Sequence, residues 1–428
     1  MRDTIFALAS ARGKAGVAVF RISGPCALDA AERLGVRGLV ARRASLRRLV
    51  FEGDLIDEAI VLWFPAMQSF TGEDVVELQV HGSAAVLSRL TAILSGLDDL
   101  RMAEPGEFTR RALAAGRMDL TEVEALADLI DAETEAQRRQ AQRILSGEMG
   151  RKVDAWRRSI VRATALIEAT IDFADEDVPE DVVPEVLALL TELREAFSQE
   201  LSGYKAAERI REGFEVAIVG SPNAGKSSLI NALVGRRAAL TSPVPGTTRD
   251  VIEVRLDLGG LPVTILDTAG LRETTDDVEA MGIRLARERA ERADLRVLLA
   301  EPGYAMPQMD LAADDIVVFG KSDVYPGVGE ISSVTGAGLD KLVDRIQQVL
   351  AKRVSGAGIL VRERHRRAMI DAIEAIDGSL GALSSPDTPL ELVAADLRRV
   401  TRMLERLVGR VDIEDLLGEI FASFCIGK

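Results

Sequence analysis

Residues 220–227, with the sequence GSPNAGKS, constrain the fold of this chain more than any other segment. They match the pattern G-x-x-x-x-G-K-[ST], and an apolar run at 216–219 precedes them while a helical run at 228–234 follows. In such a loop, backbone N–H groups surround phosphate oxygens, the lysine reaches the β and γ phosphates, and the final hydroxyl can ligate Mg²⁺. A chance glycine-rich turn is the alternative, but it requires neither flanking element. The segment therefore predicts a phosphate-binding α/β domain in which Lys226 and Ser227 contact the ligand.

Two segments downstream of this loop fit the same kind of site. Asp267 opens the tetrapeptide DTAG after an apolar strand at 263–266, where an aspartate can hold Mg²⁺ through water and a glycine can sense the γ phosphate. The pentapeptide GTTRD at 246–250 offers Thr248 as a second Mg²⁺ ligand. Isolated threonines are more often ordinary turn residues, so this prediction depends on the phosphate loop upstream.

The segment GKSD at 320–323 follows an apolar strand at 316–319, where a G domain carries its guanine-reading N-K-x-D. Asp323 can accept two hydrogen bonds from the guanine edge and the stem of Lys321 can cover the base, so we expect GTP to be preferred over ATP. Gly320 stands in place of the asparagine that would join the base to the phosphate loop. Since a lost hydrogen bond costs about 0.5–1.5 kcal/mol, we expect weaker nucleotide binding rather than none. The next element, SSV at 332–334, also departs from the usual Ser-Ala-Lys.

Hydrolysis requires a group that orients the attacking water and a positive charge that neutralises the developing negative charge. Leu271 follows Gly270 at the position where Ras-like enzymes place their catalytic glutamine. The sequence therefore predicts a different catalytic device.

Length and charge limit the possible classes of protein. A chain of 428 residues exceeds what one core covers, which predicts two or three domains. Lys and Arg number 53 against 68 Asp and Glu, so a net charge of -15 repels polyanions, and any nucleic-acid contact must be local or shared with a partner. Cys26 and Cys425 form no closely spaced metal pattern and suit a reducing cytoplasm. No apolar run reaches the roughly 20 residues of a membrane span, so we expect a cytoplasmic protein with no membrane contact.

The residue pattern divides the chain into four segments: a mixed α+β domain at 1–118, a helical part at 119–212, a doubly wound Ras-like α/β domain at 213–350, and a second helical part at 351–428. The expected strands lie at 17–22, 59–64, 75–80, 216–219, 263–266, 297–299 and 316–319, and an expected helix covers 83–94. We therefore predict a multidomain α+β and α/β protein, in which the α/β domain is inserted into a helical domain whose two halves pair.

Motifs along the whole chain resemble the MnmE family, also called TrmE. In the α/β domain they are Asn223 within the phosphate loop, GTTRD at 246–250, DTAGLR at 267–272 and VE at 278–279. Outside it they are DTI at 3–5, RISG at 21–24, SFTGEDVVEL at 69–78, PGEFT at 105–109, DLIDA at 128–132 and FCIGK at 424–428. Because the matches run from the third residue to the last in family order, the resemblance covers the whole chain.

The resemblance implies that two G domains meet across the nucleotide and that K⁺ acts where an arginine finger otherwise would. By resemblance, K⁺ would be held at Asn223, Ser242, Val244 and Thr247, and Mg²⁺ at Ser227 and Thr248. Glu279 would orient the water, although an unplaced glutamate is more often a solvated carboxylate at a helix start. The expected GTP contacts are Asn223, Ala224, Gly225, Lys226, Ser227, Ser228, Ser242, Thr247, Thr248, Asp267, Thr268, Ala269, Gly270, Lys321 and Asp323.

For the N-terminal domain, the resemblance implies dimerisation and binding of 5-formyltetrahydrofolate or a related tetrahydrofolate. The matching positions are Arg21, Glu77, Arg117 and Lys428; position 117 is commonly lysine in the family, and without the resemblance all four would be taken for surface residues. Cys425 would be either a residue of the modification chemistry or an inert buried thiol.

The family's activity is K⁺-dependent GTP hydrolysis coupled to the addition, with the flavoprotein MnmG (GidA), of a carboxymethylaminomethyl group to C5 of the wobble uridine at position 34 of certain tRNAs. A homodimer, a heterotetrameric or larger complex with MnmG, and contact with tRNA are implied. The amine donor and the tRNAs selected stay open. Two alternatives remain: a ribosome-assembly GTPase of the Era or Der type, and a relative whose nucleotide site has decayed, as Gly320 suggests. The motifs before residue 120 argue against the first, and the intact Lys226 and Asp267 argue against the second.

Overall fold

The computed structural model describes residues 3–172, 182–221, 223–236, 253–267, 288–304, 310–385 and 389–411, together with 417, 418, 420, 421, 424 and 427. It divides into two compact units, Met1–Ala127 with Glu405–Lys428, and Asp128–Leu404. Within the described parts of the chain, no helix is long and apolar enough to cross a membrane. The domain limits at 118, 212 and 350 remain predictions.

The first unit is built on a six-stranded sheet with the strand order β3-β4-β5-β2-β1-β6. The strands are β1 (Thr4–Leu8), β2 (Ala15–Ser23), β3 (Ser45–Phe51), β4 (Asp54–Phe64), β5 (Val75–Gly82) and β6 (Leu100–Met102). Neighbouring strands are antiparallel except for β1 and β6, which are parallel. The expected α+β class and the three expected strands are confirmed.

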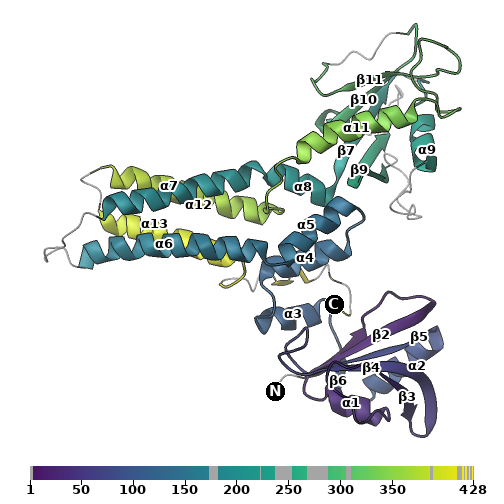
Figure 1. Cartoon of the computed structure of the whole chain (residues 1–428), viewed down its shortest axis with the longest axis vertical. Coiled ribbons are helices and arrows are strands. Elements are labelled where there is room, and N and C mark those ends of the chain that lie inside the picture. Colours follow the sequence, from purple (N-terminus) through teal and green to yellow (C-terminus); the bar gives the residue numbers. More distant parts are fainter. Residues whose placement is uncertain are drawn as a thin grey trace, which may run out of the picture. The chain divides into compact units, whose positions relative to one another are not determined.

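Helices α1 (Ala27–Arg33) and α2 (Ala84–Ser95) pack on this sheet (Figure 1). Phe6, Phe20 and Leu78 lie in the core that the helices and the sheet share. The start of α2 is fixed by Ser83, whose side chain accepts a hydrogen bond from the backbone N–H of Val86. The helix expected at 83–94 is therefore present.

Two more helices of this unit, α3 (Glu107–Ala114) and α4 (Leu120–Ile130), contact the end of the chain. Phe421 and Phe424 share a buried cluster with Val123 of α4. Gly106 precedes α3 with φ of 67°, and a Cβ there would lie 2.6 Å from the Phe421 ring, so only glycine fits. The C-terminal residues thus return to the unit in which the chain begins.

The second unit contains a group of helices that pack on one another and a separate α/β domain. The helices are α5 (Glu135–Leu145), α6 (Glu148–Asp172), α7 (Val183–Ser202), α8 (Tyr204–Glu212), α12 (Glu363–Leu383) and α13 (Leu390–Leu407). Trp156 of α6 meets Phe197 of α7 edge to face, with ring centroids 5.0 Å apart. Arg398 of α13 donates to Glu168 of α6 at 3.1 Å, and α12 packs on α7. Helices before and after the inserted domain thus pair, as predicted.

The second unit also contains a five-stranded sheet with the order β11-β10-β7-β9-β8. The strands are β7 (Phe214–Gly220), β8 (Glu253–Leu258), β9 (Leu261–Asp267), β10 (Leu295–Ala300) and β11 (Ile316–Phe319). All pairs are parallel except β8 with β9, which a two-residue turn joins. Gly259 and Gly260 have φ of 67° and 85°, as a tight hairpin of this kind requires. The antiparallel edge strand β8 is an addition to the parallel strands expected.

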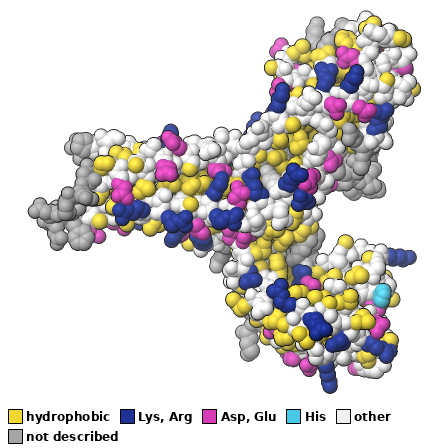
Figure 2. All heavy atoms as spheres, in the orientation of Figure 1, with side chains coloured by type: hydrophobic (Ala, Val, Ile, Leu, Met, Phe, Trp, Pro, Cys, Tyr) yellow, Lys and Arg dark blue, Asp and Glu magenta, His cyan; other side chains and the backbone are white. Residues whose placement is uncertain are grey.

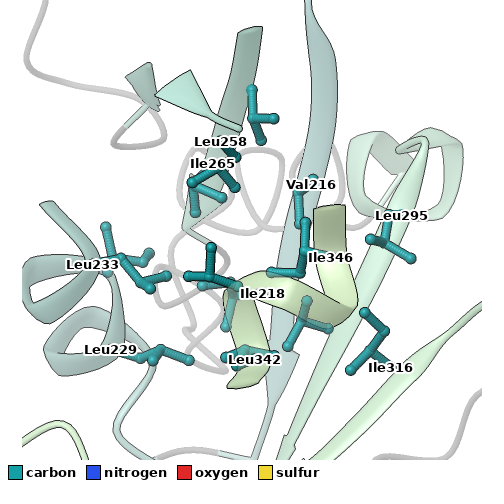
Figure 3. Packing of buried hydrophobic residues seen from close by; sticks show 14 of the residues in the cluster. Val216, Ile218, Leu229, Leu233, Leu258, Ile265, Leu295, Ile316, Leu342 and Ile346 are labelled. Carbon is teal, nitrogen blue, oxygen red and sulfur yellow. The ribbon is translucent and has the colours of Figure 1, made fainter. Parts of the chain in front are cut away.

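Helices α9 (Lys226–Arg236) and α11 (Leu339–Val354) cover one face of this sheet. Figure 3 shows Leu229 and Leu233 of α9 and Leu342 of α11 directed at Ile218 of β7. On the other face, Ala290 packs against Ala217 and Leu266. The sheet is therefore covered on both faces, as the doubly wound class requires.

Candidate functional site

The loop between β7 and α9 lies at the carboxyl end of the central strand of the second unit's sheet. Gly220 ends β7, and a Cβ there would lie 2.4 Å from the carbonyl oxygen of Leu299, so no side chain fits. Asn223 has φ of 64° and Gly225 has φ of 97°. These left-handed residues turn the chain back before α9 begins at Lys226. The tight loop followed by a helix N-terminus is the geometry that binds phosphate.

Lys226 is 7% exposed and its ammonium donates to the carbonyl oxygens of Gly220 and Ser221, at 2.9 and 3.1 Å. Burial lowers the pKa of Lys226, while the nearby Asp267 carboxylate acts in the opposite direction. A buried ammonium held by neutral carbonyls retains most of its electrostatic attraction for an anion.

The hydroxyl of Ser227 donates to Oδ2 of Asp267 at 2.9 Å. This contact arises because β7 and β9 are adjacent parallel strands, with Ile218 opposite Asp267, so their carboxyl ends meet at one edge of the sheet. A hydroxyl and a carboxylate at one point provide the hard oxygen ligands that Mg²⁺ prefers. Of the two residues expected to hold Mg²⁺, Ser227 is thus placed suitably, whereas Thr248 lies outside the described residues.

The expected guanine-reading loop follows β11 at the same edge of the sheet. Gly320 donates its N–H to the carbonyl of Ala300 at 2.8 Å, and Lys321 follows in the left-handed region, with φ of 58°. Asp323 is exposed, as a residue that reads a base must be. Ser332 is fully buried and its Oγ accepts hydrogen bonds from the N–H groups of two following residues, which shapes the turn.

Gly320 lies close to both the end of β10 and the phosphate loop. A Cβ at this position would lie 3.1 Å from Cδ1 of Leu299 and 3.7 Å from the carbonyl oxygen of Ala224 in the phosphate loop. Position 320 therefore faces the phosphate loop, and the end of the Leu299 side chain would have to shift slightly to admit a side chain.

Two residues that contact each other beside Lys321, Glu301 and Tyr325, were not predicted from the sequence. Glu301, directly after β10, accepts from the Lys321 ammonium at 2.6 Å and from the Tyr325 hydroxyl at 3.3 Å. A glutamate after a strand carries no motif of its own, so only the pairing of β10 with β11 could have indicated it.

Several predicted positions lie outside the described residues, and their roles stay predictions. They are Ser242, Val244, Thr247, Thr248, Thr268, Ala269, Gly270, Glu279, Cys425 and Lys428. Of the other expected GTP contacts, Ala224 is buried, and Ser228 is exposed in the first turn of α9.

In the first unit, Arg21 of β2 lies opposite Glu77 of β5, and its Nε donates to the carboxylate at 2.9 Å. The guanidinium also lies 5.7 Å from the ring centroids of Phe70 and Phe108. The side chains of Arg21 and Glu77 are 23% and 18% exposed, so both are partly buried. Arg117 is exposed, and its stem passes beside Gly72.

A buried ionic cluster lies beside this pair. Arg111 is 8% exposed and contacts Glu107 at 2.9 Å and Glu73 at 3.1 Å, while Ser23 donates to Glu73 at 2.8 Å. Burial would raise the pKa of Glu107, but hydrogen bonds from Arg101, from the Glu104 N–H and from Arg111 lower it to about 2. The cluster fixes the loop before β5 through matched charges.

The phosphate loop, the Ser227–Asp267 contact and the loop after β11 define the second unit's α/β domain as a P-loop nucleotide-binding domain of the G-domain type. The model of the MnmE helical domain matches residues 120–425, and that of the GTP-binding protein TrmE N-terminus matches 4–117. The tRNA modification GTPases MnmE of Cereibacter sphaeroides (strain ATCC 17029 / ATH 2.4.9) and Ruegeria pomeroyi are each 58% identical, over 100% of this chain and 100% of theirs. The chain belongs to the MnmE family of tRNA modification GTPases, and the resemblance found in the sequence is confirmed.

Among solved structures, Aquifex aeolicus Era bound to GDP and AlF4⁻ is 25% identical, with a TM-score of 0.26, over 32% of this chain and 56% of that one. The cytosolic domain of the Thermotoga maritima FeoB iron transporter is 17% identical, with a TM-score of 0.24, over 46% of this chain and 98% of that one. With scores this low, the G-domain assignment depends on the strand order and the phosphate loop. Membership of the MnmE family decides against the Era or Der alternative.

Proposed function

We propose that this protein is a K⁺-dependent GTPase that acts with MnmG to add a carboxymethylaminomethyl group to C5 of the wobble uridine of certain tRNAs. The observation that carries the proposal is the contact of Ser227 with Asp267 beside the buried Lys226. The tRNA modification GTPases MnmE to which the chain is similar match it over its full length. These contacts suit a phosphate and Mg²⁺ site, and they argue against the decayed-site alternative.

In the proposed reaction, Lys226 binds the β and γ phosphates, and Ser227 with Thr248 holds Mg²⁺. Asn223 contributes to a K⁺ site completed by Ser242, Val244 and Thr247, and Glu279 orients the water. When bound, the two cations neutralise charge on the phosphate oxygens. The exposed side chain and left-handed backbone of Asn223 support this role, because the side chain is accessible to a ligand.

The N-terminal domain is proposed to bind a tetrahydrofolate and to mediate dimerisation. Arg21, held by Glu77 and flanked by two phenylalanine rings, supports this part of the proposal because it combines a half-buried charge with apolar walls. Arg117 and Lys428 would add positive charge for the carboxylates of the ligand.

Nucleotide state is proposed to reach the helices through contacts at the base of the G domain. Asp294, directly before β10, lies 2.8 Å from Nε of Arg209 in α8 and accepts the N–H of Glu215 in β7 at 2.9 Å. Gly260 in the β8–β9 turn accepts the N–H of Ala136 in α5 at 3.0 Å. A pocket of about 330 Å³ that is open to solvent lies beside this turn. Strand β7 leads directly into the phosphate loop, so a single strand connects Glu215 with that loop.

Contact with tRNA is proposed to depend largely on MnmG. Figure 2 shows basic and acidic side chains interspersed over the visible face of the helices, without one large basic patch. In the arginine-rich start of α12, Arg366 and Arg367 pair with Glu363 at 2.6 and 3.0 Å. Such paired charges attract a polyanion weakly.

The proposal is tested by combining the purified protein with MnmG of the same organism, undermodified tRNA, GTP, a tetrahydrofolate, flavin and a nicotinamide donor. We expect nucleoside mass spectrometry to detect the modified wobble uridine in KCl. The variant Ser227→Ala should lose both hydrolysis and modification. Hydrolysis without any modified uridine would overturn the tRNA part of the proposal and leave the GTPase part standing.

A further inference from the structure

The guanine-reading loop of this protein must be held in place without the asparagine that normally joins it to the phosphate loop. Gly320 occupies that position, where a Cβ would lie 3.1 Å from Cδ1 of Leu299. The backbone hydrogen bond from the N–H of Gly320 to the carbonyl of Ala300 fixes the start of the loop but does not control the side chain of Lys321.

A cluster of three side chains supplies this control from the neighbouring strand. Glu301 follows β10, which is parallel to β11, and its side chain is only 14% exposed. It accepts from the ammonium of Lys321 at 2.6 Å and from the hydroxyl of Tyr325 at 3.3 Å, while the N–H of Tyr325 donates to the carbonyl of Lys321 at 2.9 Å. The cluster thus closes residues 321–325 onto the end of β10.

The backbone of Lys321 needs such support. Its φ of 58° lies in the left-handed region, which residues with a side chain occupy only when their surroundings stabilise it. A hydrogen bond between two charged groups, one of them largely buried, is strong enough to select one conformation of a flexible lysine. In that conformation the alkyl stem is fixed while Asp323 stays exposed.

We propose that Glu301 is a positioning residue for guanine-nucleotide binding, which substitutes for the missing asparagine by holding Lys321 over the base. This inference depends on the proposed GTP binding. Tyr325 assists by orienting the Glu301 carboxylate. Neither residue touches the phosphates, so both act on affinity rather than on the hydrolysis step.

The test compares Glu301→Gln with the wild-type protein, using titration calorimetry with GDP and a slowly hydrolysed GTP analogue. We expect both affinities to fall about tenfold, as for the loss of one hydrogen bond to a charged group. The Michaelis constant for GTP should rise by a similar factor while the rate at saturating GTP stays within about twofold of wild type. Glu301→Asp should recover part of the affinity, and Tyr325→Phe should lose about threefold.

Glu330→Gln is the matched control, because Glu330 lies at the end of the same loop with a half-exposed side chain paired to Arg345 at 3.6 Å. It should bind as wild type does. Lys321→Met removes the same ion pair from the other side, so the double variant with Glu301→Gln should bind no more weakly than the weaker single variant. Additive losses in the double variant would overturn the inference, and so would unchanged binding by Glu301→Gln. Tighter binding by Glu301→Gln would also overturn it, because it would mean that Glu301 withdraws Lys321 from the nucleotide.

Failure of the proposed function would give a different result. In that case the wild-type protein itself would bind neither nucleotide. A direct check of base reading is Asp323→Asn. This variant should prefer xanthine nucleotides over guanine nucleotides, because the asparagine amide can donate to the extra oxo group of xanthine. If that exchange occurs while Glu301→Gln has no effect, the base site is established and the role of Glu301 is rejected.

Discussion

Two buried cations in this protein have opposite surroundings. Arg111 in the first unit contacts three carboxylates, those of Glu107, Asp3 and Glu73, at 2.9, 2.9 and 3.1 Å. Lys226 in the G domain donates to the neutral carbonyls of its own loop. The pKa of Arg111 is raised, because the carboxylates outweigh burial, whereas that of Lys226 is lowered by burial. The charge pairing around Arg111 suits a site that stabilises the fold. The neutral groups around Lys226 suit a site for an anionic ligand.

The largest effect is expected for Lys226→Met, which keeps the stem and removes the charge. GTP hydrolysis should fall on the order of a thousandfold or more, because the β and γ phosphates lose their main cation. Without nucleotide, the free energy of unfolding in urea should stay the same or increase, since a buried ammonium no longer has to be desolvated. A large loss of stability with retained hydrolysis would break the comparison.

Arg111→Met should instead affect stability. Removing the guanidinium takes the shared cation from the buried Glu73 and Glu107, of which Glu107 keeps Arg101, and should lower the free energy of unfolding by about 3 kcal/mol. Affinity for GDP should not change. Arg89→Met is the control, because Arg89 is 49% exposed and pairs with a 65% exposed Asp54, so its loss should cost about 0–1 kcal/mol. Equal costs for the two variants would contradict the assignment of a buried structural cluster.

The pH dependence of unfolding sharpens the same point. The pKa of Glu107 falls from 4.5 to about 2 on folding, so its contribution is complete above pH 4.5 and is lost as the pH falls toward 2. The difference corresponds to about 3 kcal/mol at most. Urea unfolding at a series of pH values should show this slope, and Glu107→Gln should make it shallower, while other carboxylates with lowered pKa values, such as Asp3 and Asp57, account for the remainder. An unchanged slope in Glu107→Gln would assign the whole effect to those other carboxylates.

A smaller effect is expected for Arg209→Met, which removes the partner of Asp294 at the contact between the G domain and α8. Thermal unfolding should show a loss of about 1–2 kcal/mol, because the carboxylate keeps the N–H of Glu215 as a donor. The exposed Arg292 offers a control, and Arg292→Met should be neutral. If both variants are neutral, Asp294 does not join the helices to the G domain.

The sequence predicted the parts of the site that local pattern specifies. The phosphate loop, the strands beside it and Asp267 at the end of β9 follow from runs of apolar residues interrupted by glycine and charge. The pair of Arg21 and Glu77 was assigned through family resemblance, because its partial burial depends on the register of β2 and β5, which residue type does not reveal. Glu301 was missed for a similar reason, since its partners Lys321 and Tyr325 lie beyond the next strand.

The most direct test of the central claim is GTP hydrolysis by the purified protein in KCl and in NaCl at equal ionic strength. A rate in KCl several times that in NaCl, lost in Asn223→Ala, would support a K⁺ site at the phosphate loop and show that Gly320 does not disable the enzyme. Equal rates near background in both salts would contradict the account of a K⁺-dependent GTPase.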